Sequence, residues 1–333
     1  MMMNEGVLTA IGNTPLVRLA RIFDDMRFDL YAKLEALNPG GSVKDRPALK
    51  ILSDGLRSGA ISPDTVIIES SSGNMGIGLA QACSYLGLKF ICVVDPKTTV
   101  QNIRLLEAYG AQVDKVLEPD PETGEFLPAR FNRVRNLLAS TTGGFWPNQY
   151  SNLSNSLAHR QTMHEIAVAL DRKVDVLLCA VSTCGTLRGC AEYIQQQGLS
   201  TKVVAVDAVG SVIFGGQRAK RLMPGHGAGV RPGLYQDNLT DQVIHVTDLE
   251  CVTGCRRLAR REGILAGASS GAVVMAMDRI RPSLREGAVC VVILPDRGER
   301  YLDTIYSNQW VEEHFGDVTH LWEETREEVH QYA

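Results

Sequence analysis

Short apolar runs alternate with longer amphipathic segments along most of the chain. Five runs rich in valine and isoleucine predict buried strands at 66–68, 90–94, 174–180, 203–206 and 289–294. Helical patterns follow several of them, at 77–85, at 100–109 and through Glu192 and Tyr193. Such alternation is typical of parallel sheets wrapped by helices. The pattern therefore predicts an α/β protein with two such layers, one on each side of about residue 150.

The chain has 333 residues, which is enough for two domains that each bury a core. The polar stretch 145–152 is the expected link between them. The segment 118–125 places prolines and a glycine among acids, which is typical of a surface loop. The charged segment after Glu312 is expected to form a peripheral helix or a tail.

Composition narrows the function classes. Hydrophobic residues make up 44% of the chain and charged residues 22%, which is ordinary for a globular protein. The formal net charge of −4 and the lack of a long basic run argue against nucleic acid or an anionic membrane as a partner. Residues 1–6 show no signal-peptide pattern and no run of 18 apolar residues occurs, so no membrane span is expected.

The cysteines indicate a compartment. Several of them, such as Cys179 and Cys290, lie within apolar runs, as buried free thiols do in reducing surroundings. We therefore expect a cytoplasmic protein. Cys251 and Cys255 are four residues apart, but they lack a second pair or nearby histidines, so no metal site is expected.

Lys44 is the first candidate for chemistry. It follows a turn at 39–41 (PGG), where the backbone can bend sharply and approach a ligand closely. Residues 48–52 predict a helix with Pro47 in its first turn. Lys44 would then lie at the positive end of a helix dipole, which suits an amine that must lose its proton and attack a carbonyl. Taken alone, a solvated surface lysine is the simpler interpretation.

Three polar loops each run into a predicted helix. The first loop, 70–76 (SSSGNMG), suits a carboxylate, and an ordinary N-cap serine is the alternative. The second loop, 182–186 (STCGT), suits a phosphate, although it has neither the Walker ending nor the dinucleotide GxGxxG. In the third loop, 266–272 (AGASSGA), a serine either donates to a neutral ring nitrogen or caps the helix. With Lys44, the loops fit pyridoxal 5'-phosphate (PLP) held as a Schiff base beside an amino-acid carboxylate.

These motifs resemble those of the fold-type II PLP enzymes, the cysteine synthase and cystathionine β-synthase family. Residues 12–19 (GNTPLVRL), 38–47 (NPGGSVKDRP), the three loops and 294–302 (LPDRGERYL) appear in that family's order. The second loop departs from the family, which usually has more glycine there. The resemblance implies the tryptophan synthase β-like fold, with two domains that each have a largely parallel twisted sheet wrapped by helices. Residues 41–150 would form the smaller domain, and 1–40 with 151–333 the larger. A homodimer is expected on the same ground.

The resemblance also implies roles for single residues. Lys44 would carry the Schiff base and, once freed, would remove the α-proton. Asn74 would donate a hydrogen bond to the 3'-oxygen of PLP, and Ser269 would face its pyridine nitrogen. The cofactor phosphate would be bound by Ser182, Thr183, Cys184, Gly185 and Thr186. The substrate carboxylate would be held, partly through backbone N–H groups, by Ser71, Ser72, Asn74 and Met75.

Ser269 carries a chemical consequence. A serine cannot stabilise a pyridinium as an aspartate would, so the ring nitrogen would stay largely unprotonated. The ring would then be a weaker electron sink, and loss of a β-substituent would compete better than a long-lived carbanion. The expected reaction is β-elimination to an aminoacrylate followed by addition of a nucleophile.

Departures from ordinary cysteine synthases resemble a narrower branch, the N-(2-amino-2-carboxyethyl)-L-glutamate synthases. They include Met75 in place of threonine, Asp296 with Arg297 in place of two serines, and the segments 146–150 and 207–215. That branch joins O-phospho-L-serine to L-glutamate with release of phosphate, and serves 2,3-diaminopropionate production for siderophores and peptide antibiotics.

Some residues leave the assignment to the branch open. The arginines at 188, 297 and 300 suit a phosphate or a dicarboxylate, or else pair with Asp296, Glu299 or Asp303. Tyr150 either lines the substrate pocket or belongs to the core. The alternatives to the branch are a cysteine synthase or O-phosphoserine sulfhydrylase that uses sulfide, a non-catalytic homologue, and a nicotinamide-dependent oxidoreductase. The missing GxGxxG argues against the last.

Overall fold

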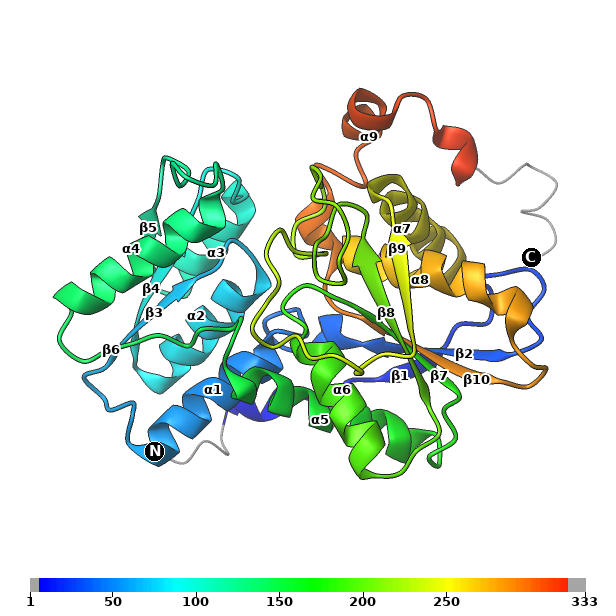
Figure 1. Cartoon of the computed structure of the whole chain (residues 1–333), viewed down its shortest axis with the longest axis horizontal. Helices are drawn as coiled ribbons and strands as arrows, with labels where there is room; N and C mark the ends of the chain where they lie inside the picture. The colour runs from blue at the N-terminus through cyan, green and yellow to red at the C-terminus, as the bar shows by residue number, and fades with distance from the viewer. Residues whose placement is uncertain (1–5, 323–333) are drawn as a thin grey trace.

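Two sheets organise residues 6–322, the part of the chain that the computed structural model describes (Figure 1). The smaller sheet has the order β5-β4-β3-β6, and its neighbouring strands are all parallel. The larger sheet has the order β1-β2-β10-β7-β8-β9, in which only β1 runs antiparallel to its neighbour. The strands of the smaller sheet are β3 (Val66–Ser70), β4 (Lys89–Val94), β5 (Gln112–Lys115) and β6 (Gly144–Phe145). Those of the larger are β1 (Leu16–Arg18), β2 (Asp29–Leu34), β7 (Val176–Ala180), β8 (Lys202–Ala208), β9 (Gln242–Val246) and β10 (Val289–Leu294).

The five strands predicted from apolar runs are confirmed as β3, β4, β7, β8 and β10, and all five are interior strands. Apolar runs did not indicate β1, β5, β6 and β9, which are the four sheet edges. An edge strand is half solvated and needs no continuous apolar run. The interior strand β2 was missed because only alternate apolar residues, Leu30 and Ala32, are fully buried in it.

Helices cover both faces of both sheets. The helices of the first half are α1 (Asp45–Ser58), α2 (Asn74–Leu86), α3 (Val100–Ala108) and α4 (Phe126–Ser140). Those of the second half are α5 (Leu153–Ala169), α6 (Gly185–Gln196), α7 (Asp248–Glu262), α8 (Ala268–Ile280) and α9 (Asn308–Phe315). Short 3-10 turns are η1 (Gly6–Ala10), η2 (Glu35–Leu37), η3 (Arg281–Ser283), η4 (Gly298–Tyr301) and η5 (Thr319–Leu321). The three helical segments predicted from periodicity are confirmed in α2, α3 and α6.

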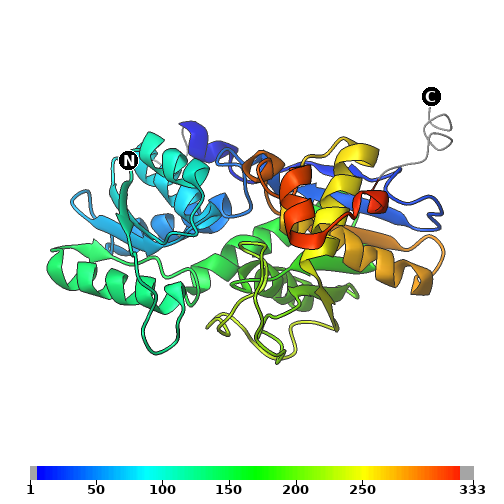
Figure 2. The same ribbon diagram turned by 90° about the horizontal axis from the view of Figure 1, so that it is seen from above.

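Different helices pack on the two faces of each sheet. In the larger sheet, α7 and α8 share an apolar core with one face, and α5 and α6 share another core with the opposite face. In the smaller sheet, α1, α2 and α3 pack on one face and α4 on the other. The two sheets lie side by side, with α1 and α5 in contact between them (Figures 1 and 2). The α/β fold with two wrapped, largely parallel sheets is therefore confirmed.

The linker and the ends follow the sequence pattern in part. The stretch 146–152 leads from β6 in the smaller sheet to α5 beside the larger one, and 118–125 is a largely exposed turn region. The domain boundaries at 40 and 150 stay a prediction. After Glu312 the chain completes α9 and forms η5, while residues 1–5 and 323–333 lie outside the described part.

All eight cysteines are buried free thiols. Within residues 6–322, no helix is long and apolar enough to cross a membrane. The same residues contain no group of three or more histidine, cysteine, aspartate and glutamate side chains that could hold a metal ion.

Candidate active site

Lys44 is the last residue before α1, and main-chain pairing holds its loop against the end of β10. The Val43 N–H donates to the Pro295 carbonyl at 2.7 Å, and Ser42 forms an antiparallel bridge with Asp296. Gly41 has φ +83°, and a Cβ there would lie 3.0 Å from the Arg297 side chain. The predicted turn therefore requires glycine both for its backbone conformation and for its close approach to the next segment.

The surroundings of Lys44 favour a neutral amine. The side chain is half-buried. Burial lowers the pKa of the amine to about 8, although Cys184 and Asp296 act in the opposite direction. A pKa near 8 leaves a useful neutral fraction at physiological pH, which a nucleophilic or basic lysine needs.

A buried ionic network fixes the start of α1. Arg46 donates to both oxygens of Glu35, at 2.7 and 2.8 Å, and to both oxygens of Glu165, at 2.7 Å each. Lys33 lies 2.7 Å from the second Glu165 oxygen and donates to the Thr14 carbonyl at 2.6 Å. Arg46, two residues after Lys44, thus connects the start of α1 to η2 through Glu35 and to α5 through Glu165. Glu165 in turn pairs with Lys33 of β2.

The first loop is locally closed by its own hydrogen bonds. The Ser71 hydroxyl accepts hydrogen bonds from the N–H groups of Gly76, at 2.9 Å, and Gly73, at 3.3 Å. The Met75 side chain is 2% exposed and packs in the core of the smaller sheet. Only the backbone N–H of Met75 can therefore meet a carboxylate, because its side chain points into the core. Ser72 is half-buried beside it.

Asn74 begins α2 and makes two side-chain contacts with the segment after β10. Its Nδ2 donates to Asp296 Oδ2 at 2.7 Å, and its Oδ1 accepts from Arg300. Tyr301 donates to the same Asp296 oxygen at 2.7 Å. The predicted first loop and the late segment 294–302 are therefore in direct contact.

The second loop turns sharply into α6. Cys184 has φ +65°, in the left-handed region that favours glycine. At Gly185 a Cβ would lie 2.3 Å from Asn155 Oδ1, so glycine is required there. Thr183 accepts from Asn155 at 3.3 Å, and Thr186 lies 3.4 Å from the buried His159 ring nitrogen. Ser182 is half-buried at the end of β7.

The third loop also lies next to Asp296. The Gly267 N–H donates to the Asp296 carbonyl at 3.2 Å, and α8 starts directly after it. Ser269 is half-buried in the first turn. The neighbouring Ser270 hydroxyl is buried and has no hydrogen-bond partner among the described residues. Lys44 and the three loops thus meet around Asp296 and Cys184.

The three arginines predicted to bind substrate, at 188, 297 and 300, each contact another protein group. Arg297 is exposed and donates to the Ala36 carbonyl at 3.0 Å. No ion pair between Arg297 and Asp296, Glu299 or Asp303 is present among the described residues, and its binding of a phosphate or dicarboxylate stays a prediction. Arg188 pairs with Glu192 at 2.7 Å, one turn further along α6. Arg300 donates to Asn74 and to the Gly40 carbonyl.

Tyr150 lies beside a buried arginine that sequence reasoning missed. Its ring packs edge-on against Phe131 with centroids 5.5 Å apart, and burial raises its pKa while Arg130 lowers it. Arg130 is 7% exposed, with Nε 3.3 Å from Asp95 but without hydrogen-bond geometry, and Nη1 has no partner in the described chain. No sequence signal distinguishes this arginine from the others on the amphipathic α4.

At the start of each loop helix, the N-cap residue itself offers no side-chain acceptor, although Ser71 accepts from the Gly76 N–H of α2. The N-caps of α2, α6 and α8 are Gly73, Cys184 and Gly267, and none accepts a backbone hydrogen bond through its side chain. By contrast, side chains cap α3, α5, α7 and α9, namely those of Thr99, Asn152, Thr247 and Ser307. Free N–H groups at helix starts bind anions such as phosphate and carboxylate. Together with Lys44, they fit an aldehyde cofactor that carries a phosphate.

Comparison with known proteins gives the family. Residues 7–296 match the family described as pyridoxal-phosphate dependent enzyme. The chain belongs to that family. It is 48% identical over 311 residues to the N-(2-amino-2-carboxyethyl)-L-glutamate synthase of Ralstonia nicotianae (strain ATCC BAA-1114 / GMI1000), covering 93% of this chain and 92% of that protein.

Solved structures agree with this membership. One is a hydrogen sulfide-producing enzyme from Fusobacterium nucleatum, with TM-score 0.83, 34% identity, and coverage of 89% of this chain and 97% of that chain. Another is the O-acetylserine dependent cystathionine beta-synthase from Helicobacter pylori, with TM-score 0.84, 30% identity, and coverage of 92% and 100%. The protein is therefore a PLP-dependent enzyme of the β-substituting kind, with the fold-type II architecture.

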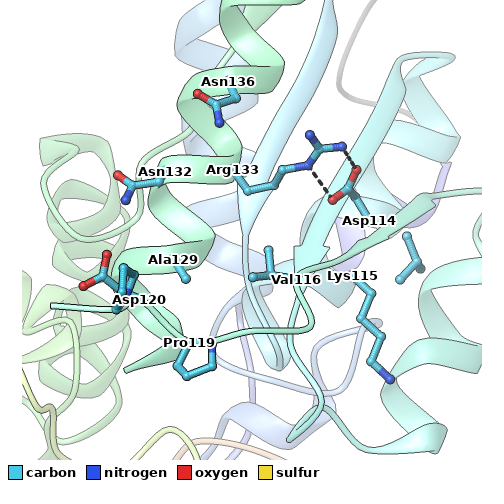
Figure 3. Close-up of a pocket in the computed structure, with 11 residues that line it drawn as sticks. Asp114, Lys115, Val116, Pro119, Asp120, Ala129, Asn132, Arg133 and Asn136 are labelled. Carbon is cyan, nitrogen blue, oxygen red and sulfur yellow. Dashed lines mark hydrogen bonds and ion pairs between the residues drawn. The ribbon is translucent and has the colours of Figure 1, made fainter. Parts of the chain in front are cut away.

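A hollow elsewhere on the smaller sheet is not part of this site. It measures about 560 Å³ and lies between β5 and α4 (Figure 3). Its Arg133 donates to both Asp114 oxygens, at 2.9 and 2.7 Å. None of its lining residues belongs to the three loops or lies near Lys44 in sequence. The chemistry of the family is thus assigned to the loops and not to this surface hollow.

Proposed function

We propose that the protein joins O-phospho-L-serine to L-glutamate and releases phosphate and N-(2-amino-2-carboxyethyl)-L-glutamate. The observation that carries this proposal is the 48% identity to a synthase of that name over 93% of the chain. The alternative is a sulfide-using enzyme that makes cysteine.

The residues have distinct tasks in this reaction. PLP supplies an electron-withdrawing ring that loosens the α-proton and the β-substituent of a bound amino acid. Lys44 would hold the cofactor and, as a neutral amine, take the proton from the substrate α-carbon. The N–H groups at the start of α2 would bind the substrate carboxylate, and those at the start of α6 the cofactor phosphate. Ser269 would face the ring nitrogen.

The bond changes balance without a further reactant. The Cβ–O bond of phosphoserine breaks and phosphate leaves with the bonding electrons. The glutamate amine forms the new Cβ–N bond and gives up one proton. The α-carbon regains a proton at the end, so each turnover consumes one phosphoserine and one glutamate.

Arg130 supports a dicarboxylate nucleophile. Burial raises the pKa of both Tyr150 and Cys92, and the nearby Arg130 charge partly opposes this rise; the Cys92 thiol donates to the Ser71 carbonyl of the first loop at 3.2 Å. Arg130 already forms a buried ion pair with Asp95 at 3.3 Å, but its Nη1 has no hydrogen-bond partner among the described residues. A carboxylate of glutamate would accept a charge-assisted hydrogen bond from this Nη1, whereas sulfide has no carboxylate to offer. We therefore place the glutamate beside Arg130 and Tyr150.

The wider setting is part of the same proposal. The product would feed 2,3-diaminopropionate synthesis for a siderophore or a peptide antibiotic, in the cytoplasm. A homodimer is part of the proposal through family membership. One exposed apolar residue of α5, Leu157, lines a hollow of about 600 Å³ between α1, α5 and α6.

The decisive experiment compares nucleophiles. Purified holoenzyme is incubated with phosphoserine and either glutamate or sulfide, while released phosphate is measured and products are identified by mass. We expect phosphate and an adduct with glutamate. Rapid cysteine formation with no glutamate adduct would establish the sulfide-using alternative instead.

A variant sharpens the comparison. Arg130→Gln should raise KM for glutamate about 10-fold to 100-fold, the loss expected for one charge-assisted hydrogen bond, and should leave turnover with sulfide nearly unchanged. Arg133→Gln, on the same helix but paired with Asp114 at the surface, is the matched control. Equal losses with both nucleophiles would remove Arg130 from the glutamate site.

A further inference from the structure

Asp296 is a buried carboxylate at the point where the loops of the site meet. It is 1% exposed and comes two residues after β10. Its Oδ2 accepts two hydrogen bonds at 2.7 Å, from Asn74 Nδ2 and from the Tyr301 hydroxyl. Its Oδ1 is buried against Gly267, where a Cβ would lie 2.1 Å from it, and has no partner in the described chain. The side chain is therefore held in one place by packing and by two donors.

The contact with Asp296 determines which way the Asn74 amide faces. A side-chain amide has an acceptor oxygen and a donor nitrogen that exchange places when the group flips. Here the oxygen accepts from Arg300 and one N–H donates to Asp296. In the flipped state the amide nitrogen would face the guanidinium and the amide oxygen would face the carboxylate. Both contacts would be repulsive, so only one orientation is stable and a single amide N–H is left over.

The same cluster also joins the parts of the site. Arg300 donates to the Gly40 carbonyl at 2.5 Å, in the turn before Lys44. The main chain of Asp296 bridges Ser42, and its carbonyl accepts from Gly267. Asn74 begins α2, which packs on the smaller sheet, and Asp296 follows β10 of the larger sheet. The two residues are 222 positions apart in sequence. The orientation of the Asn74 amide is thus fixed relative to Lys44.

We propose that Asp296 is a positioning residue that presents the remaining Asn74 N–H to the phenolic oxygen of bound PLP. In PLP this oxygen is on the ring carbon next to the one that bears the aldehyde, so it lies nearest the lysine among the ring's polar atoms. A serine at 296 has a shorter side chain, so that Arg300 would be the remaining contact that orients the amide. The proposal depends on the cofactor and on Asn74, and on neither the phosphoserine nor the glutamate of the proposed reaction.

The test uses bound PLP and no substrate. Asp296→Leu removes both acceptors and keeps the branched shape, with two methyl groups that are larger than the carboxylate oxygens, whereas Asp296→Asn keeps an acceptor oxygen where Oδ2 lies. We expect Leu to weaken PLP binding about 10-fold or more, as for one lost hydrogen bond to a charged group, and to shift the visible absorption maximum of the bound cofactor. Asp296→Asn should restore most of both. An Asp296→Asn variant as impaired as Leu would overturn the proposal, because charge rather than orientation would then matter.

A double-variant cycle separates positioning from simple structural support. If Asp296 acts through Asn74, then adding Asp296→Leu to Asn74→Ala should change neither the PLP dissociation constant nor the absorption maximum further. Tyr301→Phe removes the other donor to Oδ2 and serves as the matched control with little spectral effect. Where Asp296→Leu does not fold, as judged by circular dichroism, Asp296→Ser takes its place. Additive effects of the two substitutions would refute a role through Asn74.

Discussion

Replacement of Glu165 by glutamine should strongly destabilise the protein, because Glu165 is the shared anion of the buried ionic network. It accepts from Arg46 at 2.7 Å and lies 2.7 Å from Lys33, and its side chain is 8% exposed. Burial by itself would raise the pKa of this carboxyl. The hydrogen bonds and charge of Arg46, and then those of Lys33, outweigh burial and lower the pKa from 4.5 to about 2.

The magnitude follows from this pKa. A pKa difference of about 2.5 at about 1.4 kcal/mol per pH unit corresponds to about 3.5 kcal/mol in favour of the folded, ionised state. Removal of one partner from a buried ion pair costs about 3 to 5 kcal/mol, which agrees. We therefore expect Glu165→Gln to lower the free energy of unfolding by about 3.5 kcal/mol at pH 7.

The pH dependence gives the sharper check. The folded pKa lies below the unfolded one, so the stabilisation is fully present above about pH 4.5 and is lost as the pH falls towards about 2. Wild type and Glu165→Gln should therefore converge in acid. Denaturant unfolding followed by far-UV circular dichroism, at pH 7 and at pH 3, measures both curves.

Glu192→Gln is the control for the loss of one carboxylate from a helix. Its pair with Arg188 is partly solvated, with side chains 27% and 19% exposed, so the loss should stay below about 1 kcal/mol. A cost below about 1 kcal/mol for Glu165→Gln, or one that is the same at both pH values, would refute the reasoning.

Three further predictions concern the cofactor site. Lys44→Ala should abolish the visible absorption of bound PLP and all turnover, with the thermal midpoint and circular dichroism nearly unchanged, since a half-buried lysine contributes little packing. The rate at which apoenzyme captures PLP should rise about 10-fold per pH unit up to about pH 8 and then level off, because only the neutral Lys44 amine attacks; a rate that is flat between pH 6 and 8 contradicts the lowered pKa. Gly185→Ala should cost about 2 kcal/mol or more and weaken PLP binding, because its Cβ would lie 2.3 Å from Asn155 Oδ1, whereas the open Gly59→Ala control should leave PLP binding intact.

Much of the candidate site could be predicted because its parts are contiguous in sequence. Each of the three loops follows an apolar strand and opens a helix, so the residue types and their spacing already describe an anion site. The turn at 39–41 likewise carries its own glycines. The same holds for the interior strands, whose burial on both faces requires continuous apolar runs.

The rest depended on contacts between residues far apart in sequence. Nothing near Arg130 shows that two of its nitrogens lack a hydrogen-bond partner inside the fold, and nothing near Met75 shows that its side chain turns into the core. Asn74 and Asp296 both belong to predicted motifs, but their hydrogen bond joins positions 222 residues apart.

The sequence by itself determined the α/β class, the interior strands, the candidate lysine and the three loops, because these are properties of local pattern. The tertiary structure decided which loop residues face one another, how Lys44 acquires a lowered pKa, and which charges are buried together. Hydrophobic periodicity is a short-range signal, whereas desolvation and ion pairing depend on every neighbour in space. In the sequence, Asp296 is only a departure from the family motif. In the fold, it contacts Asn74, Tyr301 and Gly267 at the point where the loops of the site meet.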